Sequence, residues 1–194
     1  MSNLAANHSG MAMVEFALVL PVMLTLGLVG IETANFAIAH QRVSQIAMMT
    51  ADNASRVRTQ MSESYINQLF TGVEKSGSAL AFKQHGKVIL SSVQNNENAD
   101  GQWIRWQRCF GMKAGLSKYG IEGKGENDRS LQALNGLTAQ AGTAVMFVEV
   151  SYDYQPIVPN SPLAGNTISY ETAAVVRQRT DFGISGTNTA QCTS

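Results

Sequence analysis

The hydrophobic positions near the N-terminus form a continuous apolar run. From Met11 to Ile31 the residues are almost all apolar, and Glu15 is the one charged residue among them. At about 1.5 Å per residue, a helix of this length spans the ~30 Å hydrocarbon core of a membrane. The run therefore predicts a helix that is long enough to cross a bilayer.

An amphipathic stripe continues this helix beyond the apolar run. Apolar or small side chains recur at steps of three and four, as they do on one face of a helix: Phe36, Ala39, Val43, Ile46, Thr50, Ala54 and Val57. We predict one helix over residues 11–58, half of it in lipid and half against a folded domain. Pro21 lies inside it and removes one backbone hydrogen bond, which membrane helices tolerate.

The rest of the chain alternates between short strand patterns and turn residues. Four segments have the β-branched and aromatic content of strands: 87–93, 103–110, 144–154 and 167–179. Weaker patterns predict short helices at 64–73 and 131–140, and the glycine-rich stretch 111–129 predicts irregular structure. The expected fold class is α+β, with the long helix packed on a small antiparallel sheet of about four strands.

This pattern divides the chain into four parts. We expect a short polar segment at 1–10, a transmembrane helix at 11–34, and an amphipathic extension of that helix at 35–60. A strand-rich domain at 61–194 completes the chain.

Composition narrows the classes of function. The chain has 194 residues, with 14 Lys plus Arg against 14 Asp plus Glu, so its formal net charge is zero. Without a basic excess, nucleic acid is not expected as a partner. Charged residues make up 14% of the chain, against roughly 25% in a typical soluble domain. The deficit is concentrated in the N-terminal run and agrees with a membrane helix.

A short motif stands at the start of the apolar run. Gly10 is followed by four residues, then by Glu15 and Phe16, and then by Ala-Leu-Val-Leu-Pro. A carboxylate at mid-membrane costs about 2.5–3.5 kcal/mol, so one that is found there usually has a function.

This motif resembles the processing site of type IV-like prepilins, and it is most similar to that of the TadE/TadF family, minor pseudopilins of tight-adherence (Tad/Flp) pilus systems. The resemblance implies cleavage by a prepilin peptidase after Gly10, a mature chain that begins at Met11, and Glu15 and Phe16 as assembly and recognition residues. It also implies that 1–10 is a prepilin-type leader and that 11–34 is the assembly helix as well as the transmembrane helix. The implied partners are the peptidase, other pilin and pseudopilin subunits, the inner-membrane pilus assembly platform and the membrane. The implied location is the bacterial inner membrane, as a single-pass protein with a periplasmic C-terminal domain, or an extracellular pilus that serves adhesion.

The resemblance gives Glu15 a specific role. On a helix, Glu15 lies on the same face as Met11, four residues earlier. Its carboxylate can pair with the new amino group of Met11 or with that of a neighbouring subunit, and the pairing is stronger in a low dielectric than in water. Small residues at Gly27, Gly30, Ala34 and Ala37 permit close approach of a second helix.

Three alternatives remain open. The sequence Ala37-Ile38-Ala39 fits a signal-peptidase site, although the apolar run is longer than that of a usual signal peptide. A pseudopilin of a type II secretion system would have the same helix. An uncleaved, membrane-anchored periplasmic binding module, with the sheet as its ligand surface, belongs to a different class.

The two cysteines, Cys109 and Cys192, match no zinc-binding spacing. An even pair in a chain with an export-type N-terminus suggests a disulfide. It would close a long loop, worth about 4–5 kcal/mol in the chain-entropy model. The alternative is two unrelated free thiols.

Other candidate chemistry is weak. Residues 96–101 partly match a calcium loop, but its first ligand would be Asn and its twelfth position is Gln107, so a plain turn is expected. His8, His40 and His85 are scattered, as solvated or packed side chains are. We expect no enzymatic site, no metal and no cofactor.

Two tryptophans lie three residues apart in the segment 103–110. In a regular strand, Trp103 and Trp106 face opposite sides, one toward the core and one outward.

Overall fold

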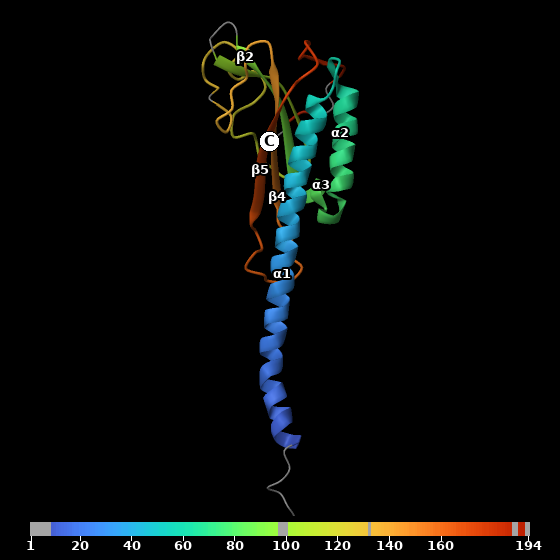
Figure 1. The fold of residues 1–194 in the computed structure, drawn as a ribbon, viewed down its shortest axis with the longest axis vertical. Coiled ribbons are helices and arrows are strands. Elements are labelled where there is room, and N and C mark those ends of the chain that lie inside the picture. Colours follow the sequence, from blue (N-terminus) through green and yellow to red (C-terminus); the bar gives the residue numbers. More distant parts are fainter. Residues whose placement is uncertain (1–8, 97–100, 132, 188–189, 193–194) are drawn as a thin grey trace, which may run out of the picture.

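The computed structural model describes residues 9–96, 101–131, 133–187 and 190–192. Its main helix, α1 (Ser9–Ser55), has 47 residues and continues through Pro21. At 1.5 Å per residue it is about 70 Å long. The first half of α1 extends alone from the rest of the protein (Figure 1). The predicted single long helix is confirmed, although it ends at Ser55 rather than at residue 58.

A four-stranded antiparallel sheet forms the body of the domain. Its strand order is β3-β2-β4-β5, and the strands are β2 (Gly86–Asn96), β3 (Gly101–Phe110), β4 (Ala144–Asp153) and β5 (Thr167–Val175). All four predicted strands are present, and β5 ends four residues before its predicted end at residue 179. The α+β fold class is confirmed.

The second half of α1 packs along β4 and β5 (Figure 1). The predicted stripe faces the sheet: Ala39, Val43, Ile46, Thr50 and Ala54 are buried, and Phe36 and Val57 pack at its margins. Small residues in the stripe let the helix approach the sheet closely. On β4, alternate side chains such as Val148 and Val150 meet the helix, because successive residues of a strand point to opposite faces.

Short elements complete this side of the sheet. The predicted second helix is present as α2 (Glu63–Ser76), and the Ser62 hydroxyl caps it by accepting from the Tyr65 amide at 3.2 Å. Four elements were not predicted: β1 (Met61–Ser62), η2 (Ser78–Leu80), α3 (Phe82–His85) and β6 (Ile184–Ser185). β1 and β6 pair in parallel, so the C-terminal region returns to the start of α2.

The predicted helix at 131–140 is wrong. In the described part of this segment, Leu134 and Leu137 form an isolated antiparallel bridge. Between them Asn135 and Gly136 have φ values of 48° and 81°, which is the tight hairpin turn that Asn-Gly favours. The turn brings Leu131, Leu134 and Ala139 onto Val145 and Phe147, on the face of the sheet away from α1.

The irregular stretch that follows β3 is irregular as predicted and is held to the sheet by two carboxylates. Glu149 on β4 accepts from the Ser117 hydroxyl and from the Lys118 amide at 3.0 Å. Glu171, its neighbour on β5, accepts from Lys118 Nζ at 2.6 Å and from the Tyr119 hydroxyl at 2.8 Å. Burial raises the pKa of Glu149, and burial together with the Glu171 bond raises the pKa of Tyr119 to about 12.

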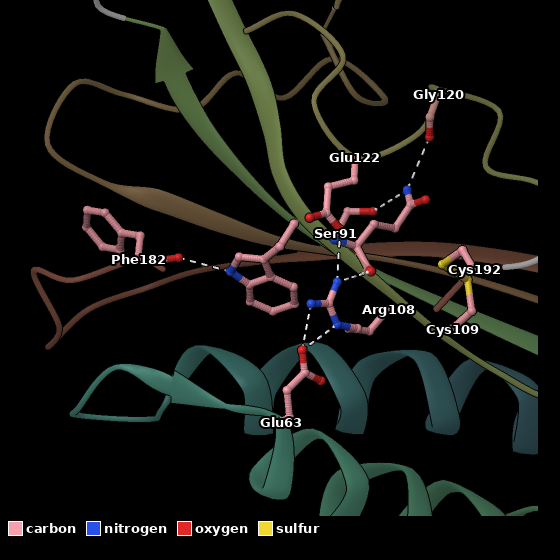
Figure 2. A network of polar contacts seen from close by, with 10 residues as sticks. Glu63, Ser91, Arg108, Cys109, Gly120, Glu122, Phe182 and Cys192 are labelled. Carbon is pink, nitrogen blue, oxygen red and sulfur yellow. Dashed lines mark hydrogen bonds and ion pairs between the residues drawn. A yellow bond between two sulfur atoms is a disulfide. The ribbon is translucent and has the colours of Figure 1, made fainter. Parts of the chain in front are cut away.

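A buried ion pair joins α2 to β3 (Figure 2). Arg108 donates to Glu63 from Nη2 at 2.6 Å and from Nε at 2.8 Å, and both side chains are buried. Arg108 Nη1 also contacts Glu122 at 2.9 Å. Since removing one partner of a buried pair strands the other charge, this contact fixes how α2 sits on the sheet.

The disulfide that the sequence predicts is present between Cys109 and Cys192 (Figure 2). It closes a separation of 83 residues and ties the C-terminal tail to the outer edge of β3. The Cys109 amide donates to the Ala190 carbonyl at 2.9 Å, so the tail also covers part of that edge.

The two tryptophans of β3 do not face opposite sides. The register with β2 pairs Trp103 with Gln94 and Ile104 with Val93, and then pairs Trp106 with Ser92. Arg105 is thus an extra residue, a β-bulge. Because Ser92 and Gln94 are two residues apart on β2, they share a face, and so do the tryptophans opposite them. Trp106 is buried and donates from Nε1 to the Phe182 carbonyl at 2.9 Å.

Candidate functional site

The first half of α1 has an apolar surface on every side. Its large hydrophobic side chains are all exposed in the isolated protein, for example Leu18 at 70% and Leu24 at 57%. The helix has the length and composition to cross a membrane. A helix that is hydrophobic all round is buried in lipid or in other helices, so this N-terminal half fits a single-pass membrane anchor.

The threonine hydroxyls within and next to the apolar half are satisfied within the helix. Thr25 donates its hydroxyl hydrogen to the Val22 carbonyl at 2.9 Å, and Thr33 donates to the Val29 carbonyl at 2.8 Å. Such back-bonding leaves no hydroxyl unpaired in a medium that cannot solvate it.

Glu15 is different. Its side chain is exposed, and it has no hydrogen-bond or ion-pair partner among the described residues. Gly10 stands in the first turn of α1, and a Cβ atom built there would meet nothing within 4 Å beyond the adjoining helix backbone. Met11 and Phe16 are 71% and 66% exposed. The predicted processing and assembly residues are therefore all accessible in the free subunit, and none contacts the sheet domain.

A second site lies where the apolar half ends, and we call it the junction site. It consists of Glu32 and Asn35 on α1, Tyr154 just after β4, and the backbone of Ile157 and Val158. The Glu32 carboxylate is only 4% exposed. It accepts from the Tyr154 hydroxyl at 2.9 Å, from the Val158 amide at 2.9 Å and from the Ile157 amide at 3.1 Å.

Aromatic contacts extend the junction site up the helix. Asn35 donates from Nδ2 to the Tyr154 hydroxyl at 2.7 Å. Phe36 packs edge-on against Tyr154 and His40, with ring centroids 4.9 and 4.6 Å apart. His40 Nδ1 lies 3.1 Å from the Tyr170 hydroxyl. These contacts join one face of α1 to the ends of β4 and β5 directly above the apolar half.

Sequence reasoning did not find the junction site. In the sequence, Glu32 stands out only as the first charged residue after the apolar run. Its hydrogen-bond partners are more than 120 residues away along the chain. A carboxylate at the end of an apolar run is the one local signal of such a site. The prolines at 156, 159 and 162 favour a loop there, but they do not indicate that its amides would meet a helix.

The remaining candidates do not come together. His40 packs against β5, His85 ends α3, and His8 lies outside the described residues. Four residues of the weak calcium-loop match, 97–100, also lie outside them. Within the described ranges no cluster of three or more His, Cys, Asp or Glu side chains is placed to hold a metal.

The architecture defines a class of protein: a long N-terminal helix, apolar on all sides and then amphipathic, that carries one small antiparallel sheet. Comparison with known families identifies a relationship within that class. Residues 10–52 match the family of TadE-like proteins. The match begins at Gly10 and covers nearly all of α1, which confirms the resemblance over this segment. No curated protein and no solved structure matches the chain.

We predict that Glu32→Ala loosens the junction site. The substitution leaves the Tyr154 hydroxyl and two backbone amides without their acceptor, so the loop after β4 loses the contacts that hold it to α1. Hydrogen exchange followed by mass spectrometry should show at least about tenfold faster exchange at Ile157 and Val158. Glu74→Ala is the matched control, because Glu74 is a half-exposed carboxylate on α2 whose ion pair with Lys83 contributes little. Equal exchange in both variants would contradict the assignment.

Proposed function

We propose that the protein is a minor pilin-like subunit of a Tad/Flp pilus, processed by a prepilin peptidase after Gly10. The observation that carries the proposal is the first half of α1, which leaves all its large apolar side chains uncovered and belongs to the segment that matches TadE-like proteins. In the membrane this half is an anchor. In a pilus the same surface packs against the helices of other subunits.

Glu15 is the register device in this mechanism. Cleavage after Gly10 creates an amino group at Met11, and the carboxylate of Glu15 pairs with that group or with the one on a neighbouring subunit. Its exposure and its lack of a partner within the described chain leave it available for an intersubunit pair. Gly27 and Gly30 support close helix packing, since a Cβ atom built at either would meet nothing within 4 Å beyond the adjoining helix backbone.

The junction site suits a subunit that is pulled from a membrane into a filament. It holds the sheet domain at a fixed position on α1, so a shift of the helix is transmitted to the domain. The signal-peptide alternative fits less well. Ala39 is buried against the sheet at 1% exposure, and cleavage there would remove Glu32 and Asn35 from the folded protein.

We predict cleavage after Gly10. When the full chain is expressed with a prepilin peptidase, intact-mass measurement should show loss of residues 1–10, and without the enzyme the chain should keep them. Gly10→Val should block the cut because it places a branched side chain at the scissile bond. Gly27→Val is the matched control, since Gly27 stands in equally open surroundings on the same helix. A full-length product in the presence of active peptidase, or a cut near Ala39, would refute the proposal.

We further predict that Glu15→Ala inserts normally but fails to assemble. A carboxylate pair in an apolar environment contributes enough that its loss should reduce incorporation into sheared pili at least about tenfold. Glu15→Gln keeps the size of the side chain and removes the charge. It should fail like Glu15→Ala if charge pairing sets the register. Normal pilus incorporation of either variant, measured by immunoblotting of pilus and membrane fractions, would rule out this role.

A further inference from the structure

A polar groove lies at the end of the sheet opposite to the junction site. It has a volume of about 580 Å³, within the range of about 300–1,000 Å³ that is typical of small-molecule sites. The residues that line it include Gln94 on β2, Trp103 and Arg105 on β3, and Glu126, Thr143 and Thr180 from the surrounding segments. We call it the distal groove.

Register places the distal groove far from the membrane helix. Gln94 pairs with Ala144 at the start of β4, and Tyr154 of the junction site comes ten residues later. At about 3.3 Å per residue, the two sites are about 33 Å apart along the strand. In Figure 1 this end of the sheet points away from the free half of α1. On an anchored subunit, the groove therefore faces outward.

The β-bulge at Arg105 builds the groove. Without it, Trp103 and Trp106 would face opposite sides of the sheet, and Arg105 would sit in the regular ladder between them. The bulge turns Arg105 out of the ladder, a known effect of bulges beside binding sites. Arg105 is exposed, and its Nη1 donates to Gln94 Oε1 at 3.0 Å. Its guanidinium carbon lies 6.0 Å from the centre of the Trp103 ring.

The second wall of the groove comes from the C-terminal region. Phe182 is buried, and its carbonyl accepts from Trp106 Nε1, which fixes the wall to β3. A side chain at Gly183 would come within 3.3 Å of Arg105 Nη2, so this segment passes close to the guanidinium group. Trp103, Arg105 and Gln94 are thus positioned by contacts that exist without a ligand.

The chemistry of the lining selects the class of ligand. Trp103 is half-buried, and its ring can pack against the C–H groups on one face of a ligand. Gln94, Thr143 and Thr180 offer both donors and acceptors. Arg105 and Glu126 are opposite charges, so the groove carries no strong field of one sign. A ligand with flat C–H faces, many hydroxyl groups and no net charge fits this combination.

We propose that the distal groove binds a neutral oligosaccharide of two or three sugar units. Trp103 stacks on one sugar face. Arg105, oriented by Gln94, donates to ring and hydroxyl oxygens, and Glu126 accepts from hydroxyl groups. This inference stands on β2, β3 and the segments around them and does not depend on the pilus role, because an anchored subunit outside any pilus would bind in the same way.

The test uses the full chain in polyoxyethylene micelles, a detergent that contains no sugar. Cellotriose, maltotriose and chitotriose are titrated in separate experiments, with saturation-transfer NMR and tryptophan fluorescence as readouts. At least one trisaccharide should bind saturably. Trp103→Ala and Arg105→Gln should each weaken its binding at least about tenfold, and Trp103→Phe, which keeps a ring, should weaken it less than Trp103→Ala.

Arg56→Gln is the matched control, because Arg56 is an exposed arginine just beyond α1 that lies outside the groove. It should bind as tightly as the parent protein. Arg105 is exposed, so Arg105→Gln decides the outcome even if Trp103→Ala unfolds. The proposal would be overturned if none of the three trisaccharides bound detectably, or if the Arg105→Gln and Arg56→Gln variants bound equally well. Binding of an extended tripeptide in place of every sugar would also overturn it and assign the groove to peptides.

Discussion

The carboxylate of Glu32 fixes the point at which one continuous helix changes from apolar to amphipathic. Before it, every side of α1 is apolar. After it, one stripe of α1 packs on the sheet and the other side meets water. A buried carboxylate is costly unless hydrogen bonds satisfy it, and here a tyrosine hydroxyl and two amides do so. The loop after β4 is consequently held at the base of the domain, and the sheet cannot slide along the helix.

Other contacts place the remaining elements around α1 and the sheet. Small residues in the stripe bring α1 close to β4 and β5, while the Arg108–Glu63 pair places α2 beside it. The disulfide and the β1–β6 pairing return the C-terminal tail to the same side. The two ends of the domain therefore differ. One end meets the anchor, and the other presents a groove that a β-bulge has shaped.

Local periodicity allowed much of this to be predicted from the sequence. The apolar run, the stripe from Phe36 to Val57 and the four strands depend on spacing within short segments. The turn at Asn135 and Gly136 was also a local signal, and reading the segment as a weak helix missed it. The partners of Glu32 in the junction site and the bulge at Arg105 had no such signal. They depend on strand register and on contacts between residues far apart in the sequence. Such contacts leave no pattern among neighbouring residues.

The central claim is that α1 leaves water before Glu32 and returns to it afterwards. Leu24, Leu28, Gln41 and Gln45 are all exposed in the isolated protein, so only a surrounding membrane distinguishes them. Each of the four residues is replaced singly by cysteine, and membrane vesicles that contain the variant are permeabilised and treated with a charged maleimide. The two native cysteines do not react, because they form a disulfide. The account predicts labelling of Gln41→Cys and Gln45→Cys and protection of Leu24→Cys and Leu28→Cys. Equal labelling at all four positions would contradict it.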